Sequence, residues 1–194
     1  GQNIQSIKLI EGKIMFTSQN GLWSINSGKE LFTEGNTKSI CEKIIRYKIS
    51  ASLDLESLKI HQKDKNGNYW LTNKNQVILT KINSNKLIIL AKTQIGPSSD
   101  VTISAFFQDN FSNTWIGTQN HGLFHLKEDK GSYLVTKIYP KKDSAINFSR
   151  IANIIQDHQN NLIVTSRANG AIKINKDALK NNDFSSSTIT LIDL

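Results

Sequence analysis

The sequence is poor in several residues on which particular protein classes depend. Its 194 residues include one cysteine, Cys41, and two prolines. A single cysteine can form neither an internal disulfide nor a thiolate zinc site. No apolar run reaches the roughly 18 residues that a membrane-spanning helix needs, and the first residues lack the pattern of a signal peptide. The composition therefore predicts a globular chain that is long enough to bury a sizeable core.

Helical periodicity is also scarce. No long segment carries apolar residues at positions i, i+3, i+4 and i+7, whereas short β-branched and aromatic runs bounded by turn residues fill the chain. This pattern predicts an all-β protein.

One stretch of the chain recurs. Residues 108–127, QDNFSNTWIGTQNHGLFHLK, share a skeleton with residues 62–82 and 155–176, and more weakly with residues 7–26. An alignment without gaps places Ile14, Trp70, Trp115 and Ile163 at one position, with spacings of 56, 45 and 48 residues. Periods near 45 residues that contain several short strands are typical of β-propeller blades.

We therefore predict a single β-propeller segment over residues 1–194, with about four blades of four-stranded antiparallel meanders. The third blade should contain strands near 101–108, 113–119, 122–128 and 132–139. Residues 35–55 exceed the length of a blade connection and are predicted to be an insertion with an extra strand near 44–49. Because one meander needs both faces covered, we expect the meanders to stack side by side. The predicted blades are 4–34, 57–93, 101–139 and 148–194.

Residues that recur in every copy are expected to serve the fold. An aspartate opens the first turn of three copies and is followed four residues later by asparagine, so its carboxylate can accept hydrogen bonds from the turn. One aspartate per blade is too far from the others to share a proton or an ion. The tryptophans of the second strand should lie between blades, next to a glycine that leaves room for a neighbour. The predicted structural positions are Asp64, Trp70, Asp109, Trp115, Gly117, Gly122, Asp157 and Gly170.

Residues that do not recur are more informative about function. In a meander, the middle loop and the connection to the next blade lie at the same end of the sheet, which we name the middle-loop face. Its loops carry amide, cationic and imidazole groups that suit hydroxyl or carboxylate ligands, although ordinary surface loops are also polar. The candidate ligand-binding residues are Lys74, Asn75, Gln119, Asn120, His121, Arg150, Arg167 and Asn169.

The net charge of +8 comes mainly from lysine, since Arg46, Arg150 and Arg167 are the only arginines. An anionic partner and a merely lysine-rich surface both account for it. Few arginines and few loop aromatics argue against nucleic-acid binding. The sequence contains no nucleophile, metal-binding or phosphate-binding motif, so we predict no catalytic site, no cofactor and no metal.

The segment NTWIGTQNHGLFHL, preceded by Gln108 and Asp109, resembles the two-component regulator propeller repeat, D-x-x-G-N-x-W-I-G-T-x-x-G-G-L. The resemblance implies the periplasmic sensor region of a hybrid two-component system of the Bacteroidetes type, in which a propeller receives oligosaccharides and a histidine kinase responds across the inner membrane. The matching residues are Asp109, Asn113, Trp115, Ile116, Gly117, Thr118, Gly122 and Leu123 in the third copy, Asp64, Gly67, Asn68 and Trp70 in the second, Asp157, Asn161 and Gly170 in the fourth, and Thr17, Gly21 and Leu22 in the first.

The chain departs from the family in two respects. Propellers of that family usually have seven blades, and the immunoglobulin-like domain, transmembrane helix and kinase are missing. The resemblance therefore implies part of a larger propeller. We expect a non-enzymatic piece of a sensor that binds an oligosaccharide, or relays its binding to a histidine kinase, with acidic oligosaccharides favoured by the charge. It would meet the membrane only through other parts of its parent chain. A closed four-blade ring, two chains that complete an eight-blade ring, and a structural or dimerisation segment stay open as alternatives.

Overall fold

The computed structural model describes residues 3–26, 44–49, 52–97, 100–140, 146–181, 184 and 188–192. The chain divides into two compact units, Gly1–Gln94 (unit 1) and Ile95–Leu194 (unit 2). Strands and turns dominate both units, and the described helices are the 3-10 turn η2 (Leu55–Ser57) and α2 (Lys176–Asn181). Over these described ranges, none of the helices has the length and apolar character needed to cross a bilayer.

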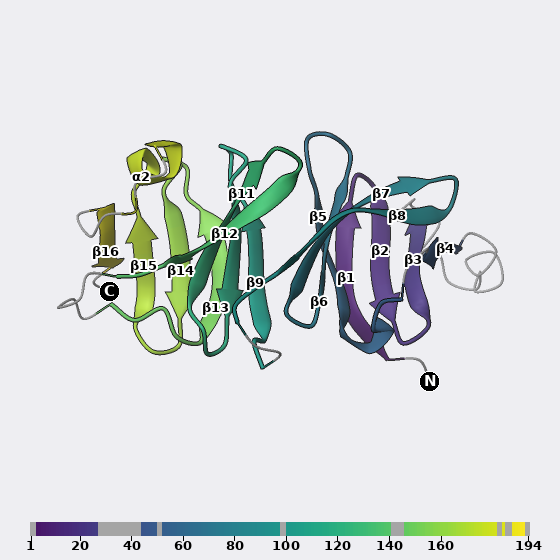
Figure 1. The fold of residues 1–194 in the computed structure, drawn as a ribbon, viewed down its shortest axis with the longest axis horizontal. Helices are drawn as coiled ribbons and strands as arrows, with labels where there is room; N and C mark the ends of the chain where they lie inside the picture. Colours follow the sequence, from purple (N-terminus) through teal and green to yellow (C-terminus); the bar gives the residue numbers. More distant parts are fainter. Residues whose placement is uncertain are drawn as a thin grey trace, which may run out of the picture. The chain divides into compact units, whose positions relative to one another are not determined.

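Unit 1 consists of two antiparallel four-stranded meanders (Figure 1). Their last strands, β4 and β8, pair in parallel through Lys48 with Lys86 and Ile49 with Leu87, so the meanders form one eight-stranded sheet. The strands are β1 (Ile4–Ile10), β2 (Lys13–Ser18), β3 (Gly21–Asn26), β4 (Ile45–Ile49), β5 (Leu58–Lys63), β6 (Tyr69–Asn73), β7 (Gln76–Asn83) and β8 (Lys86–Gln94).

Unit 2 consists of two separate four-stranded sheets (Figure 1). In each sheet, strands that follow one another in sequence pair antiparallel, which confirms the predicted all-β meanders. The strands are β9 (Ile103–Gln108), β10 (Thr114–Thr118), β11 (Leu123–Asp129), β12 (Ser132–Ile138), β13 (Ile151–Gln156), β14 (Leu162–Ser166), β15 (Gly170–Ile174) and β16 (Ile189–Ile192).

The first meander differs from the prediction. Its fourth strand is β4, which pairs antiparallel with β3 through Leu22 with Tyr47 and Ser24 with Ile45. The strand expected near 44–49 is therefore a member of the first blade and not an extra strand in an insertion, and the blade extends beyond residue 34. Burial explains the placement, because Tyr47 is 5% exposed and its hydroxyl lies 2.7 Å from the Ser24 hydroxyl. Residues 27–43, which include Cys41, lie outside the described residues.

The two sheets of unit 2 meet around Trp115 and Gly117 on β10. Trp115 is fully buried in a core shared with Ile151, Leu162 and other residues of the second sheet. A Cβ atom at Gly117 would lie 3.1 Å from the Ala105 Cβ and would overlap the Ile151 side chain. Glycine is therefore required where β13 approaches β10.

The two meanders of unit 1 meet around Met15, which is 1% exposed in a core shared with Leu58, Ile60 and Leu71. Met15 and Trp115 each stand three residues before the last residue of their strand. The structural equivalent of Trp115 is therefore Met15, and the predicted Ile14 is wrong by one residue. Because side chains alternate between the faces of a strand, a slip of one residue moves Ile14 to the opposite face.

Candidate functional site

The three repeated aspartates form the same hydrogen-bonded turn. In the third copy, Asp109 Oδ1 accepts from the backbone N–H groups of Phe111 and Asn113, each at 2.9 Å, and Oδ2 accepts from Asn113 Nδ2 at 2.9 Å. Asp64 makes the equivalent contacts with Asn66 and Asn68, and Asp157 with Gln159 and Asn161. The hydrogen bond from Asn161 holds the pKa of the Asp157 carboxyl below its ordinary value. These carboxylates are occupied by their own turns.

The last residue of each second strand is a small polar residue whose side chain forms hydrogen bonds, with partners that differ between the copies, and it was not among the predicted site residues. Asn73 Nδ2 donates to the Ser57 hydroxyl at 3.3 Å, the Thr118 hydroxyl donates to the Gly122 carbonyl at 2.8 Å, and the Ser166 hydroxyl donates to the Ser149 carbonyl at 2.6 Å. The Ser18 hydroxyl accepts from Trp23 Nε1 at 3.0 Å. A small polar residue recurs here in all four copies, and this recurrence could have identified the position from the sequence. These contacts shape the middle-loop face. The four residues are Ser18, Asn73, Thr118 and Ser166, all 5% exposed or less.

In unit 2, backbone hydrogen bonds draw the loops of both sheets together. The Gln119 N–H donates to the Thr102 carbonyl at 3.0 Å, the Arg150 N–H to the Gln119 carbonyl at 2.8 Å, and the Arg167 N–H to the Arg150 carbonyl at 3.1 Å. Three candidate residues from different loops, Gln119, Arg150 and Arg167, are thus neighbours along one backbone path. All three are exposed.

A pocket of about 210 Å³ opens beside this path. It is formed by the β10–β11 loop, the end of β12 with the two residues after it, and residues 146–149 just before β13, and its lining includes the candidates Asn120 and His121. The Tyr139 ring is 68% exposed at the pocket, with Lys137 Nζ 5.3 Å from the ring centroid. Cationic, amide and aromatic groups therefore meet in one concave surface.

The remaining candidates in unit 2 support this pocket. His121 Nε2 lies 3.3 Å from Asp100 Oδ2, and the His121 N–H donates to the Thr118 hydroxyl at 3.0 Å. The Asn169 Oδ1 accepts from the Asn147 N–H at 2.9 Å, which links the β14–β15 loop to a residue of the pocket lining. Six of the eight candidates therefore lie at the middle-loop face of unit 2.

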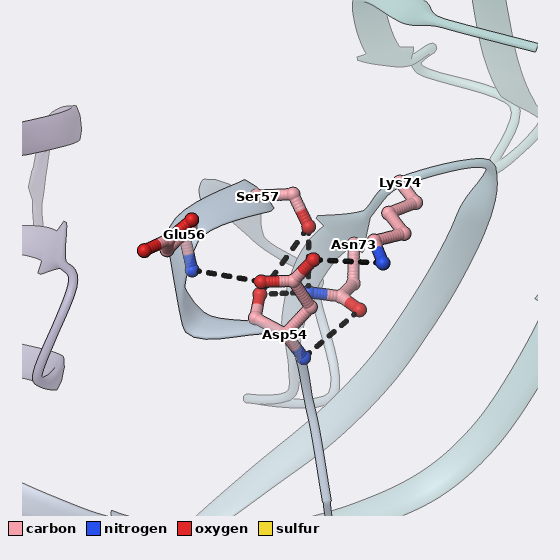
Figure 2. A network of polar contacts seen from close by, with 5 residues as sticks. All are labelled: Asp54, Glu56, Ser57, Asn73 and Lys74. Atoms are coloured by element: carbon pink, nitrogen blue, oxygen red, sulfur yellow. Dashed lines mark hydrogen bonds and ion pairs between the residues drawn. The ribbon is translucent and has the colours of Figure 1, made fainter.

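The other two candidates, Lys74 and Asn75, lie in the β6–β7 loop of unit 1. Figure 2 shows Lys74 Nζ directed at the Asp54 carboxylate, 2.9 Å from Oδ2, while Asp54 Oδ1 accepts from the Glu56 N–H at 3.1 Å. The hydrogen bond from Lys74 lowers the pKa of the Asp54 carboxyl below its ordinary value. Asn75 is 8% exposed. The Lys74 ammonium group is thus already paired and the Asn75 side chain is largely covered, so neither forms an open ligand-binding group here.

The sequence analysis missed the aromatic and cationic part of the pocket. Tyr139 and Lys137 lie on either side of the last residue of β12, and Asn147 lies in the connection from β12 to β13. No copy of the repeat carries a tyrosine at an equivalent place, so no pattern singled out Tyr139. In the sequence, the only local feature that could have drawn attention to Tyr139 is the proline that follows it, Pro140.

The tryptophans of the repeat do not form a ligand surface. Trp70 and Trp115 are 2% and 0% exposed. Trp115 Nε1 donates to Asp109 Oδ2 at 3.0 Å, and its ring lies 4.8 Å from His125 and 5.2 Å from Phe184. Burial lowers the pKa of His125 to about 4. This aromatic cluster belongs to the core of unit 2.

No protein-family model matches the chain, and no curated protein matches it. Solved structures are similar in fold. The extracellular domain of a putative hybrid two-component system from B. thetaiotaomicron is 17% identical, with a TM-score of 0.60 over 98% of this chain and 25% of that one. A catalytically inactive virginiamycin B lyase from Staphylococcus aureus is 16% identical, with a TM-score of 0.61 over 100% of this chain and 56% of that one.

The WD40 β-propeller domain of Doa1 is also similar, with 11% identity and a TM-score of 0.57 over 88% of this chain and 50% of that one. The chain thus spans between a quarter and about half of these proteins. Together with the antiparallel meanders, these likenesses define the class of fold: the chain is a β-propeller segment.

Proposed function

We propose that this chain is a non-enzymatic sensor segment of an extracytoplasmic, periplasmic part of a two-component system, and that the middle-loop face of unit 2 binds an oligosaccharide. The observation that carries the proposal is the pocket beside Tyr139, where loops from two sheets bring amide, cationic and aromatic groups together. The fold shared with the extracellular domain of a hybrid two-component system supports it, as does the resemblance of residues 108–123 to the regulator propeller repeat.

The chemistry of the pocket suits a sugar. An exposed tyrosine offers a flat apolar face to the C–H groups of a sugar ring, and its hydroxyl remains available for hydrogen bonding. The Asn120 and Asn147 amides can donate to and accept from sugar hydroxyls. Among the described lining residues there is no carboxylate, so the pair of carboxyl groups that most glycoside hydrolases use is missing there and binding is favoured over sugar cleavage.

Ligand binding could act on a kinase without any chemistry in this segment. It is sufficient that the oligosaccharide binds one arrangement of the sensor more tightly than another, because this difference in affinity shifts the population. The parent chain's kinase, its membrane helix and its further blades are part of the proposal.

The direct test is calorimetric titration of the chain with neutral and acidic oligosaccharides. We expect binding at millimolar concentration or tighter, and we expect Tyr139→Ala to weaken it about tenfold, which corresponds to about 1.4 kcal/mol. Phe111→Ala is the matched control, since Phe111 is an aromatic residue 39% exposed in the Asp109 turn, away from the pocket lining. No binding of any oligosaccharide, or equal losses in the two variants, would contradict the proposal.

A structural or dimerisation segment is the second candidate. It is favoured by β1, the outermost strand of its sheet, where Ile7 and Leu9 are 59% and 69% exposed. A second copy of the chain or further propeller blades would cover these side chains. Sedimentation velocity decides between the candidates: association that Leu9→Lys abolishes supports this role, and a monomer at all concentrations contradicts dimerisation.

A further inference from the structure

Arg46 in unit 1 is held by a hydrogen bond to the β2–β3 loop and by contact with the Trp23 ring. Its Nη2 donates to the Asn20 carbonyl at 2.7 Å, and its Cζ lies 5.2 Å from the centroid of the Trp23 ring. The Ser18 hydroxyl fixes both neighbours, because it accepts from Trp23 Nε1 at 3.0 Å and from the Asn20 N–H at 3.2 Å. In the part of unit 1 that the structure describes, no ion pair involves Arg46.

Arg46 lies at the edge of a pocket of about 490 Å³ in unit 1. The pocket is formed where the β2–β3 loop, the end of β4 and the segment before η2 meet. The described lining contains two cationic side chains, Arg46 and Lys48, and no carboxylate. The neighbouring Asp54 carboxylate is already paired with Lys74 (Figure 2). The described lining of this pocket therefore carries an excess of positive charge beside the half-buried, apolar Leu53 and Leu55.

Arginine rather than lysine at this position narrows the class of ligand. A guanidinium group presents parallel N–H donors that match both oxygens of a carboxylate, and stacking on an aromatic ring holds that fork in one plane. The chain has only three arginines among its 24 Lys and Arg residues. Arg46, the arginine held in place on the exposed surface of unit 1, therefore has the geometry to bind a planar anion.

We infer that the pocket of unit 1 binds the carboxylate of an acidic saccharide, with Arg46 as the principal contact and Lys48 as a second cation. The leucines provide the apolar wall for the face of the sugar ring. This inference rests on the proposed function, because it names the class of oligosaccharide. It adds a second site, in the other unit from the Tyr139 pocket, and it distinguishes acidic from neutral ligands.

The test uses trigalacturonate and a neutral galactotriose of the same length with the 194-residue chain. Binding is followed by calorimetry and by the Trp23 indole N–H signal in two-dimensional NMR. Trp23 is the reporter because it contacts Arg46 directly, whereas Trp70 and Trp115 are 2% and 0% exposed. We expect trigalacturonate to shift the Trp23 signal and Arg46→Gln to weaken its binding at least about tenfold, a typical loss when a charged hydrogen-bonding partner is removed.

Two further variants separate recognition from general charge. Arg46→Lys keeps the charge but loses the planar fork, and we expect most of the affinity to be lost with it. Lys81→Gln is the matched control, because it removes one positive charge from an exposed position of unit 1 outside the pocket lining. If Lys81→Gln weakens binding as much as Arg46→Gln, or if Arg46→Gln has no effect, the inference is wrong.

The neutral sugar distinguishes a failure of the Arg46 site in unit 1 from a failure of the proposed function in unit 2. If galactotriose binds and responds to Tyr139→Ala while trigalacturonate leaves Trp23 unchanged, the inference about unit 1 fails and the proposed function stands. If neither sugar nor any other oligosaccharide binds, both are overturned. If the Trp23 shift occurs and is insensitive to Tyr139→Ala, the site in unit 1 is independent of the first.

Discussion

The two units build the same arrangement of meanders by different means. In unit 2, an aromatic and hydrogen-bonded cluster of Trp115, His125 and Phe184 lies between two separate sheets. In unit 1, the equivalent position is Met15 among aliphatic side chains, and the parallel pairing of β4 with β8 joins the meanders directly. The comparison shows two ways to bury the face between neighbouring meanders. One is the tryptophan cluster, and the other is aliphatic packing together with pairing of the last strands.

Both units share one polar feature at their first strands. The Ile60 N–H of β5 donates to the Ser6 hydroxyl of β1 at 2.9 Å, and the Ser104 hydroxyl of β9 donates to the Ile151 carbonyl of β13 at 2.6 Å. In each case a serine on one first strand bonds to the backbone of the next first strand. The close approach of these strands is thus common to both units, and the difference lies in the hydrophobic layer behind them.

The largest expected effect comes from truncating the two equivalent core residues. Trp115→Ala should destabilise unit 2 by about 3–5 kcal/mol, as is typical for a buried aromatic residue. Met15→Ala should cost unit 1 less, in the lower part of the roughly 2–5 kcal/mol range for aliphatic truncation, since it removes fewer atoms and no hydrogen bond. Urea unfolding followed by amide hydrogen exchange assigns each loss to a unit. A greater loss from Met15→Ala would show that the aliphatic core is the stronger of the two.

The next effect compares the same turn in the two units. Asp109 accepts from Trp115 Nε1 in addition to the turn donors and is 5% exposed, whereas Asp64 is only half-buried. Because a hydrogen bond to a charged group contributes about 1.5–3 kcal/mol, Asp109→Ala should destabilise the chain by at least about 1 kcal/mol more than Asp64→Ala. Thermal unfolding of both variants measures the difference. Equal losses would mean that the bond to the indole adds nothing.

The pH dependence is the third expected effect. Burial lowers the pKa of His125 to about 4, with the nearby Lys127 acting in the same direction and Asp109 opposing. Between pH 6.5 and 4 the unfolded chain therefore binds the proton that the folded chain excludes. The free energy of unfolding therefore has its full value above pH 6.5. It decreases by on the order of 2–3 kcal/mol as the pH falls toward 4.

A matched pair of variants assigns this pH dependence to the units. Burial also lowers the pKa of His61 in unit 1, to about 3. His125→Gln should flatten the pH dependence of amide exchange in unit 2, and His61→Gln should do so in unit 1. If His125→Gln leaves the pH dependence of amide exchange in unit 2 unchanged, His125 is not its cause.

The predictability of the fold follows the strength of the motif. The third copy carries the Asp turn and the Trp-Ile-Gly-Thr strand, and its predicted strands agree with the structure to within two residues. The first copy replaces the Asp turn by Glu11-Gly12, where both residues have positive φ. The middle loop of this copy is also one residue shorter, because two residues separate the paired Ser18 and Gly21 whereas three separate the paired Thr118 and Gly122. An alignment without gaps that matches Gly21 to Gly122 therefore selected Ile14 instead of Met15.

Two further misses have physical causes. Helix α2 is six residues long, too short for a helical period, and begins where Asn175 Oδ1 accepts from the Asp177 N–H at 3.0 Å.

For the candidate site, the topology of a meander correctly gathered Gln119, Arg150 and Arg167 at one end of unit 2. The side chains that give the pockets their chemistry, Tyr139 and Arg46, do not recur in the repeat, and only tertiary contacts reveal them.

One contact in unit 2 has a consequence for the order of folding. Asn113 Nδ2, in the turn of the first sheet, donates at 3.1 Å to the carbonyl of Leu179 in α2, 66 residues later, and Phe184 closes over the Trp115 ring. A chain emerging from the ribosome can thus form β9–β12 early, yet Trp115 stays uncapped until residue 184 has been synthesised. Contacts between such distant residues form slowly because a long loop must first close. During that interval the indole is exposed apolar surface, of the kind that makes incompletely folded chains prone to aggregate.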